Sequence, residues 1–214
     1  MKTQKTNGVF NRSGLAALSD LHSPEHKKLF SILEKDQSVF MQKEQEWRSP
    51  EYRWPSAPLY DFSRVWEYPY AFYHFSKFID IFENEYRPIL VDIGSGVTFF
   101  PFSLAKLGYN VICTDIDPIC QRDLSKAINI VPQSLGNVNF RLFKQKNILP
   151  FDDDECDGVY CISVLEHISN FEETVIEMAR VLKPGGLCII TCDINLNPKD
   201  DLQLKIAEHR RLVS

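Results

Sequence analysis

Residues 89–98 read Ile-Leu-Val-Asp-Ile-Gly-Ser-Gly-Val-Thr, an apolar run that carries one acid and leads into two glycines one residue apart. An apolar run bounded by glycine is typical of a buried parallel β-strand, and residues 99–107 can continue as a helix. Glycine lets the chain turn tightly, so a ligand can approach bare backbone N–H groups. The stretch therefore predicts a strand, a nucleotide-type turn and a helix.

The residues on either side of the glycine pair help to choose between ligands. A dinucleotide fingerprint, G-x-G-x-x-G, needs glycine at position 99, where this chain has Phe99. A phenyl ring is too large there for a diphosphate at the helix start, so NAD and FAD are disfavoured. Asp92 instead suits a ligand with a cationic amino group, because a carboxylate at a strand end can pair with an ammonium.

Length and composition limit the class of protein. The chain has 214 residues, 44% of them hydrophobic, which predicts one α/β domain with a helical extension. It shows no long uncharged apolar run and no signal-peptide pattern, so we expect a cytoplasmic protein without a membrane span. Six cysteines without a C-x-x-C pair indicate buried free thiols and no metal site. Acids outnumber Lys and Arg after residue 88, which disfavours a nucleic-acid substrate.

A second strand is predicted over residues 109–115, and it ends in Asp115, about 20 residues beyond Gly94. A carboxylate at that distance lies at the end of the neighbouring strand, where it can accept both ribose hydroxyls of an adenosine. Asp117 and Pro118 then begin a helix that runs to about Ile130, with Asp117 as its cap. We therefore assign Asp115 to ribose and Asp117 to structure.

The remaining pattern alternates strands and helices. Residues 137–144, 156–162 and 187–192 predict strands, and residues 171–182 predict an amphipathic helix. Three short motifs lie between these elements: Leu-Pro-Phe at 149–151, Val-Leu-Glu-His at 164–167 and Arg-Val-Leu-Lys-Pro-Gly-Gly at 180–186. The second motif follows a strand directly, at the carboxyl edge where open α/β sheets bind ligands.

Together, D-x-G-x-G at 92–96, Asp115, V-L-E-H and R-V-L-K-P-G-G resemble, in order, the landmarks of class I S-adenosylmethionine-dependent methyltransferases of small acceptors, including the quinone O-methyltransferases. The resemblance implies a Rossmann-like, doubly wound, mostly parallel sheet. It also implies methyl transfer from S-adenosyl-L-methionine to the hydroxyl or amino group of a small molecule by in-line displacement.

The same resemblance implies which residues bind the cofactor. The chain departs from the family at Thr98, where glycine is usual, and just before Leu149, where an acid is usual; Asn147 or Gln145 can replace that acid through a side-chain oxygen. The expected cofactor-binding residues are Asp92, Gly94, Ser95, Gly96, Asp115, Ile116, Asn147, Ile148 and Ile162. His167 is the candidate general base, although it can equally cap or orient its loop.

The first 87 residues predict an arm and a helical, aromatic-rich cap, and residues 88–214 the cofactor-binding domain. Residues 1–23 are polar and suggest a loose arm, whereas Ser23 and Pro24 begin a helix that reaches about Trp47. A later helix carries a stripe of Phe72, Phe75, Phe78, Ile79 and Phe82, which we expect to pack against the sheet. Its polar side and the residues before it are the candidate substrate wall: Arg64, Trp66, Glu67, Tyr68, Tyr70, Tyr73 and His74.

The C-terminal pattern is shorter than the family's. Members usually add a sixth and a seventh strand, whereas residues 197–213 here predict one charged helix. Either the chain is truncated, or its sheet stops at five strands and leaves an edge for a second copy or a partner chain. An active enzyme, an inactive cofactor-binding scaffold and a nucleotide-dependent reductase all remain open, and cofactor calorimetry followed by a turnover assay separates them.

Overall fold

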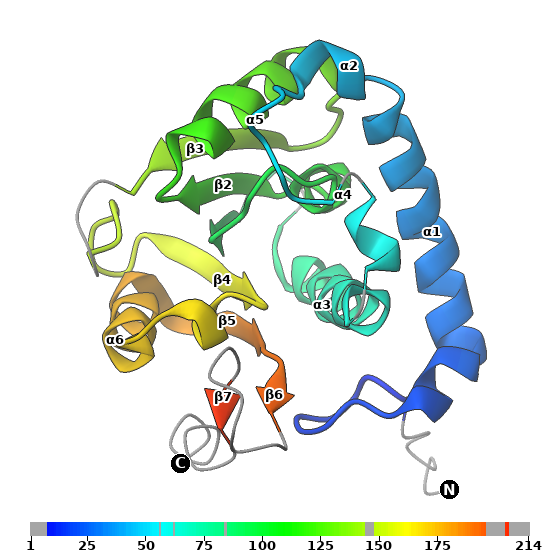
Figure 1. Ribbon diagram of the computed structural model, residues 1–214. Helices are drawn as coiled ribbons and strands as arrows, with labels where there is room; N and C mark the ends of the chain where they lie inside the picture. The colour runs from blue at the N-terminus through cyan, green and yellow to red at the C-terminus, as the bar shows by residue number, and fades with distance from the viewer. Residues whose placement is uncertain are drawn as a thin grey trace, which may run out of the picture.

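The computed structural model describes residues 8–55, 57–61, 63–83, 85–143, 148–195 and 204–205. These residues form a five-stranded parallel sheet of order β3-β2-β1-β4-β5, with helices on both faces (Figure 1). The doubly wound, Rossmann-like architecture expected from the sequence is confirmed. Within the described residues, this sheet has five strands.

The strands bring the motifs to one edge of the sheet. They are β1 (Ile89–Ile93), β2 (Asn110–Asp115), β3 (Asn137–Leu142), β4 (Cys156–Ile162) and β5 (Leu182–Thr191). Because all of them run parallel, the turns that follow β1, β2 and β4 meet at the carboxyl edge. The strand order reverses between β1 and β4, and such a switch point is where open α/β sheets bind ligands.

Helices cover the two faces unequally. On one face, α3 (Arg64–Phe78), α4 (Phe100–Leu107) and α5 (Pro118–Ile130) share a core with the sheet, and α6 (Phe171–Val181) packs on the other. The longest helix, α1 (Pro24–Met41), runs outside α3 and α4, and the short α2 (Glu44–Trp47) contacts α5 (Figure 1). The described residues also form four 3₁₀ turns: η1 (Leu18–His22), η2 (Pro58–Tyr60), η3 (Ile79–Ile81) and η4 (Leu165–His167).

The predicted helix caps are confirmed. Ser23 Oγ accepts a hydrogen bond from His26 N at 3.0 Å, and Asp117 Oδ1 accepts one from Ile119 N at 2.8 Å. The cap helix expected up to Trp47 is divided, because α1 ends at Met41 and α2 starts only at Glu44.

The N-terminal arm is packed in its described part, which corrects the expectation of a loose segment. Phe10 is fully buried, and its ring contacts those of Trp66, Tyr70 and Tyr73 on α3. Asp20 is 4% exposed and forms an ion pair with Arg12. We call residues 8–22 the strap, because they lie along the outer side of α3.

The buried face of α3 differs from the predicted stripe. Phe72 and Phe75 are buried as expected, and Phe75 packs edge-on against Tyr109 and Tyr160. Phe78 and Phe82, in contrast, are only partly buried, because α3 ends at Phe78. Tyr68, Pro69, Ala71 and Tyr73 are buried in their place, so the packing side lies further towards the helix start.

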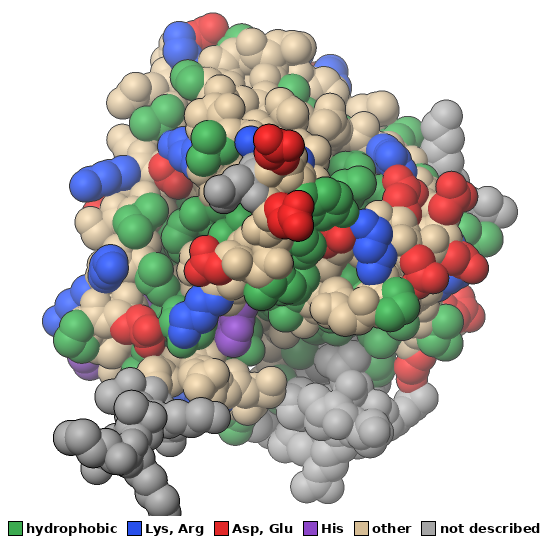
Figure 2. Space-filling model, turned by 180° about the vertical axis from the view of Figure 1, so that it is seen from behind, with side chains coloured by type: hydrophobic (Ala, Val, Ile, Leu, Met, Phe, Trp, Pro, Cys, Tyr) green, Lys and Arg blue, Asp and Glu red, His purple; other side chains and the backbone are tan. Residues whose placement is uncertain are grey.

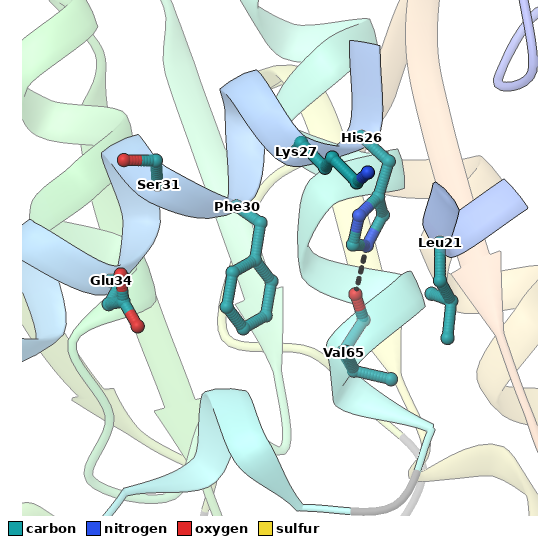
Figure 3. Close-up of a pocket in the computed structure, with 7 residues that line it drawn as sticks. All are labelled: Leu21, His26, Lys27, Phe30, Ser31, Glu34 and Val65. Carbon is teal, nitrogen blue, oxygen red and sulfur yellow. Dashed lines mark hydrogen bonds between the residues drawn. The ribbon is translucent and has the colours of Figure 1, made fainter. Parts of the chain in front are cut away.

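A proline inside α3 explains how this helix binds to α1. Pro69 has no N–H, so the carbonyl of Val65 cannot receive the usual i to i−4 hydrogen bond. His26 Nε2 of α1 donates to that carbonyl at 2.7 Å instead, as Figure 3 shows. The unmet acceptor of one helix is thus satisfied by a side chain of the other.

The chain after α6 corrects two boundaries. Strand β5 begins at Leu182, immediately after the helix, and its pairing with β4 shifts register between Cys156 and Gly158, so residues 183–186 belong to an irregular strand and not to a turn. Beyond it, β6 (Ile194–Asn195) pairs in parallel with β7 (Leu204–Lys205). Residues 204–205 are therefore extended where a helix was expected, and the rest of that predicted helix lies outside the described residues.

Candidate functional site

The glycine turn is tight, and the loop after β4 packs against it. Gly94 and Gly96 have φ angles of +67° and +55°, a region that glycine adopts at little cost. A Cβ atom on Gly94 would lie 2.7 Å from the Val164 methyl groups, so this glycine also allows the loop after β4 to approach.

The backbone N–H groups of the turn are already hydrogen-bonded, which corrects the expectation that they are bare. Ser95 N donates to Thr114 O at 3.0 Å, Gly96 N to Asp115 Oδ2 at 3.0 Å, and Val97 N to the Tyr52 hydroxyl at 2.8 Å. A diphosphate would find these three donors in use, so the turn is unsuited to a dinucleotide.

Asp92 is a buried carboxyl group at the end of β1. It is 5% exposed, and burial raises its pKa to about 8; the Tyr160 hydroxyl lowers this pKa and the Asp115 carboxylate raises it. Strand register places Tyr160 beside Asp92. A buried carboxylate is costly without a cation, and the ammonium group of a ligand would supply one.

Asp115 joins the second strand to the glycine turn. Its Oδ2 accepts from Gly96 N at 3.0 Å, and its Oδ1 accepts from Asp117 N at 2.9 Å. Each carboxylate oxygen has a second lone pair, so both can still accept a ribose hydroxyl. The neighbouring Ile116 side chain is 72% exposed and open to a ligand.

The other expected cofactor contacts are placed in part. Ile162 is buried at the end of β4, and Ile148 is 50% exposed beside the Leu-Pro-Phe motif. Asn147 and its alternative Gln145 lie outside the described residues. The structure therefore brings Asp92, Asp115 and the glycine turn together at the carboxyl edge of the sheet.

A buried carboxylate of α3 meets the loop after β4. Ser163 Oγ donates to both oxygens of Glu67, at 2.8 and 3.0 Å, and Ser63 Oγ donates to Oε2 at 3.1 Å. Arg64 Nη1 lies 3.5 Å from the same Oε2. Ser163 itself is 4% exposed and has a φ of +49°, a strained conformation for a residue other than glycine.

The proposed general base is at the surface. His167 is exposed in η4, and its backbone N–H donates to Val164 O at 2.9 Å. The side chain of its neighbour Glu166 contacts the residues that follow β5, because Glu166 Oε1 accepts a hydrogen bond from Asp193 N at 3.1 Å. Catalysis by His167 stays a prediction, whereas Glu67 and Ser163 are a buried, hydrogen-bonded polar pair at this edge.

Most of the candidate substrate wall holds the strap. Trp66 Nε1 donates to Asp20 at 3.0 Å, the Tyr70 hydroxyl donates to Arg12 O at 3.0 Å, and His74 Nε2 donates to Phe10 O at 2.9 Å. Tyr73 is 6% exposed and packs on Phe10, while Lys77 lies over its ring. Arg64 contacts Glu67 instead of the strap. A role of these side chains in substrate binding stays a prediction.

Two further features of the surface are a hollow beside α1 and the distribution of charged side chains. A hollow of about 340 Å³ lies between α1 and the start of α3 (Figure 3). Its lining residues are Leu21, His26, Lys27, Phe30, Ser31, Glu34 and Val65. On the face drawn in Figure 2, Lys and Arg side chains are scattered among acidic and apolar ones and form no continuous positive patch.

Three further findings concern the class of protein. No helix among the described residues is long and apolar enough to cross a membrane. Those residues also contain no group of three His, Cys, Asp or Glu side chains that could hold a metal ion. All six cysteines are free thiols; Cys113, Cys120, Cys156 and Cys161 are buried as expected, whereas Cys188 is exposed and Cys192 partly buried.

The known proteins that this chain resembles include methyltransferases. Residues 91–190 match the family model described as a methyltransferase domain. The chain is 34% identical over 110 residues to an uncharacterized methyltransferase of Mycobacterium leprae strain TN, and 29% identical over 103 residues to a ubiquinone biosynthesis O-methyltransferase of Rickettsia akari. These matches cover 51% and 48% of this chain and 39% of each relative.

A solved structure shows the same fold. It is a putative sarcosine dimethylglycine methyltransferase from Galdieria sulphuraria, with a TM-score of 0.55 and 18% identity over 70% of this chain and 57% of that one. The domain match, the sequence relatives and the motifs at the carboxyl edge agree on one family. Through residues 91–190, the chain is similar to the class I S-adenosylmethionine-dependent methyltransferases.

Proposed function

We propose that this protein transfers a methyl group from S-adenosylmethionine to the hydroxyl or amino group of a small molecule. The observation that carries the proposal is the convergence of Asp92, the glycine turn and Asp115 at the switch point of the sheet. The buried Asp92 carboxyl group fits the cofactor, because no described residue supplies the cation that the cofactor's ammonium would provide.

The chain's own residues divide the binding work. Asp92 would hold the ammonium group, Asp115 the ribose hydroxyls, and Ile116 and Ile148 the faces of the adenine ring. Gly94, Ser95 and Gly96 would form the turn against the methionine part. Bound S-adenosylmethionine supplies an electrophilic methyl group with a neutral thioether as the leaving group. The protein must mainly orient the acceptor, and positioning of this kind can be worth about 7 to 11 kcal/mol.

The acceptor would bind between the first turn of α3 and the loop after β4. Support comes from the contacts of Glu67 with Ser163, which join these two elements at the edge where the cofactor is expected. In this proposal, residues 1–87 form the cap that selects the acceptor and residues 88–214 form the cofactor-binding domain.

Calorimetry and a transfer assay test the proposal. Purified protein is titrated with S-adenosylmethionine, with S-adenosylhomocysteine and with NAD, and transfer of a tritiated methyl group is then followed over a panel of small alcohols and amines. We expect both sulfur compounds to bind, NAD not to bind, and at least one acceptor to be methylated. Tight NAD binding without binding of the sulfur compounds would refute the proposal, and binding without any transfer would identify an inactive scaffold.

A further inference from the structure

Three carboxyl groups from different elements gather where β4 and β5 end. Glu67 comes from α3, Glu166 from η4, and Asp193 from the residues that follow β5. Glu166 Oε1 accepts from the backbone N–H of Asp193 at 3.1 Å, and Ser163, the residue after β4, donates to Glu67. We call these three residues the acidic cluster.

The members of the acidic cluster act on one another electrostatically. Burial raises the pKa of Glu67, and Asp193 raises it further. Burial also raises the pKa of Glu166, and the nearby Glu67 carboxyl group raises it further. Arg64 and the exposed His167 are the cations that oppose these shifts, one beside Glu67 and one beside Glu166. Three carboxyl groups thus meet two basic side chains, Arg64 and His167, at this place.

Two polar atoms at the same place lack a hydrogen-bond partner in the described structure. Thr191, at the end of β5, is 8% exposed, and its Oγ1 bonds to no described residue, although it lies close enough to Glu67 to oppose the rise in pKa that burial causes. Glu166 Oε2 is buried without a partner as well. Buried polar atoms are nearly always hydrogen-bonded, so these two indicate a ligand that completes the site.

The backbone strain at Ser163 also indicates a ligand-binding site. A serine with a φ of +49° costs stability that glycine would not, and such strain is typical of functional sites. Here the serine hydroxyl holds both oxygens of Glu67, a contact that glycine could not make. The strained Ser163 therefore fixes the orientation of the Glu67 carboxyl group.

We infer that the acidic cluster binds the protonated amino group of the methyl acceptor, so that the substrate class is a small amine and Glu67 is the group that takes its proton. This inference rests on the proposed function. An ammonium group has donors enough for Glu67, Glu166 Oε2 and Thr191 Oγ1, and its charge balances the excess of carboxylates. An acceptor with only a hydroxyl would leave that charge unbalanced.

The chemical step balances. One N–H proton moves from the acceptor ammonium to a Glu67 carboxylate oxygen, which frees the nitrogen lone pair. The lone pair forms a bond to the methyl carbon while the carbon–sulfur bond breaks, and that electron pair stays on sulfur as a neutral thioether. The product is a methylated ammonium, and Glu67 later returns its proton to water. Burial raises the pKa of Glu67, which makes its carboxylate a stronger base towards the ammonium proton.

Matched probes separate an amine site from a hydroxyl site. The protein, saturated with S-adenosylhomocysteine, is titrated in a calorimeter with phenethylamine against 2-phenylethanol and with putrescine against 1,4-butanediol. We expect the amine of at least one pair to bind about tenfold or more tightly than its alcohol. Glu67→Gln and Glu166→Gln should each remove most of this preference without changing the affinity for S-adenosylhomocysteine, and Glu46→Gln on the exposed side of α2 is the matched control.

Ser163→Gly tests the positioning role of Ser163 in a variant whose backbone strain is relieved. It should still fold, because the relieved strain offsets part of the lost hydrogen bonding, and it should lose part of the amine preference. Equal or tighter binding of the alcohols, or no amine binding to the saturated protein, would overturn the inference and leave the proposed function standing. A preference unchanged in Glu67→Gln and Glu166→Gln would overturn it too, whereas a protein that fails to bind S-adenosylhomocysteine would overturn both.

Discussion

Asp92 is the residue whose charge most depends on a ligand. Burial holds its pKa at about 8, against 3.8 for the free side chain, so the carboxyl group is mainly protonated at pH 7 in the free protein. Pairing with the cofactor's ammonium would favour the charged form and lower this pKa. Binding and proton release at Asp92 are therefore coupled.

We predict that cofactor binding at pH 7 releases up to about one proton and tightens as the pH rises from 6 towards 8. The folded pKa is raised, so the stability that Asp92 adds to the free protein is fully present below 3.8 and is lost as the pH rises through about 8. Calorimetry in two buffers of different ionisation enthalpy measures the released proton, and Asp92→Asn is the control that should release none. Equal apparent enthalpies in both buffers for the parent protein would count against this coupling.

Asp115 is the second residue at which the binding site is testable. Asp115→Ala removes the acceptor assigned to ribose and should weaken cofactor binding by about 1.5 to 3 kcal/mol, the range for hydrogen bonds to a charged group. It also frees Gly96 N, so Asp115→Asn, which keeps one oxygen, should cost less. Calorimetry gives the affinities and circular dichroism checks the fold. An unchanged affinity in folded Asp115→Ala would mean that the ribose is held elsewhere.

Sequence patterns found the residues whose roles depend on near neighbours. Asp92, the glycine pair and Asp115 are set by strand ends and by their spacing along the chain, and the structure places them at one edge. The pairing of Glu67 with Ser163 joins residues 96 positions apart, which no local pattern encodes. Glu67 was therefore only one of several polar candidates, and the strain at Ser163 was invisible until its φ angle was known.

At the scale of elements, α3 illustrates what periodicity can and cannot decide. The recurring aromatic residues predicted a helix correctly, but α3 carries aromatic side chains on several sides, and the strap covers a side that was expected to form the substrate wall. Which side is buried depended on the neighbouring segments and not on the helix alone. The predicted stripe is therefore confirmed at Phe72 and Phe75, which are buried, and in part at Phe78 and Ile79, which pack against the core while partly exposed. Phe82 lies beyond the helix and outside that core.

We predict that Phe75→Ala lowers the free energy of unfolding by about 3 to 5 kcal/mol, since the ring is fully buried between Tyr109 and Tyr160. Phe82→Ala, a partly buried ring beyond the end of α3, should cost clearly less. Urea unfolding followed by circular dichroism measures both. Similar losses for the two variants would show that the core extends to the end of the predicted stripe.

The contact between α1 and α3 gives a second test at this scale. His26→Leu leaves the carbonyl of Val65 without its donor and should cost about 1 to 3 kcal/mol of stability. In a Pro69→Ala background the new N–H can bond to that carbonyl, so the same replacement should cost less. Urea unfolding of the four proteins in this double-mutant cycle gives the coupling. Strictly additive losses would mean that His26 stabilises the protein by packing alone.

At the scale of the molecule, the cap and the sheet share one core. Leu33 and Phe40 of α1 belong to the same buried cluster as Leu90 of β1 and Leu104 of α4. Ser49 donates to the buried Asp123 of α5 from both its N–H, at 2.8 Å, and its hydroxyl, at 2.6 Å. The proposed boundary near residue 87 thus separates two roles in the sequence and does not separate two cores.

We predict that cap and sheet unfold together. The three tryptophans, Trp47, Trp54 and Trp66, all lie before residue 88, so tryptophan fluorescence reports on the cap, whereas far-ultraviolet circular dichroism reports on the whole chain. The shared core predicts that both signals change at the same urea concentration, as a two-state transition requires. Ser49→Ala, which removes one of the two bonds to Asp123, should shift both midpoints downward by the same amount. A fluorescence transition that precedes the loss of circular dichroism would show that the cap unfolds on its own, and the acceptor site between α3 and β4 would then open without loss of the sheet.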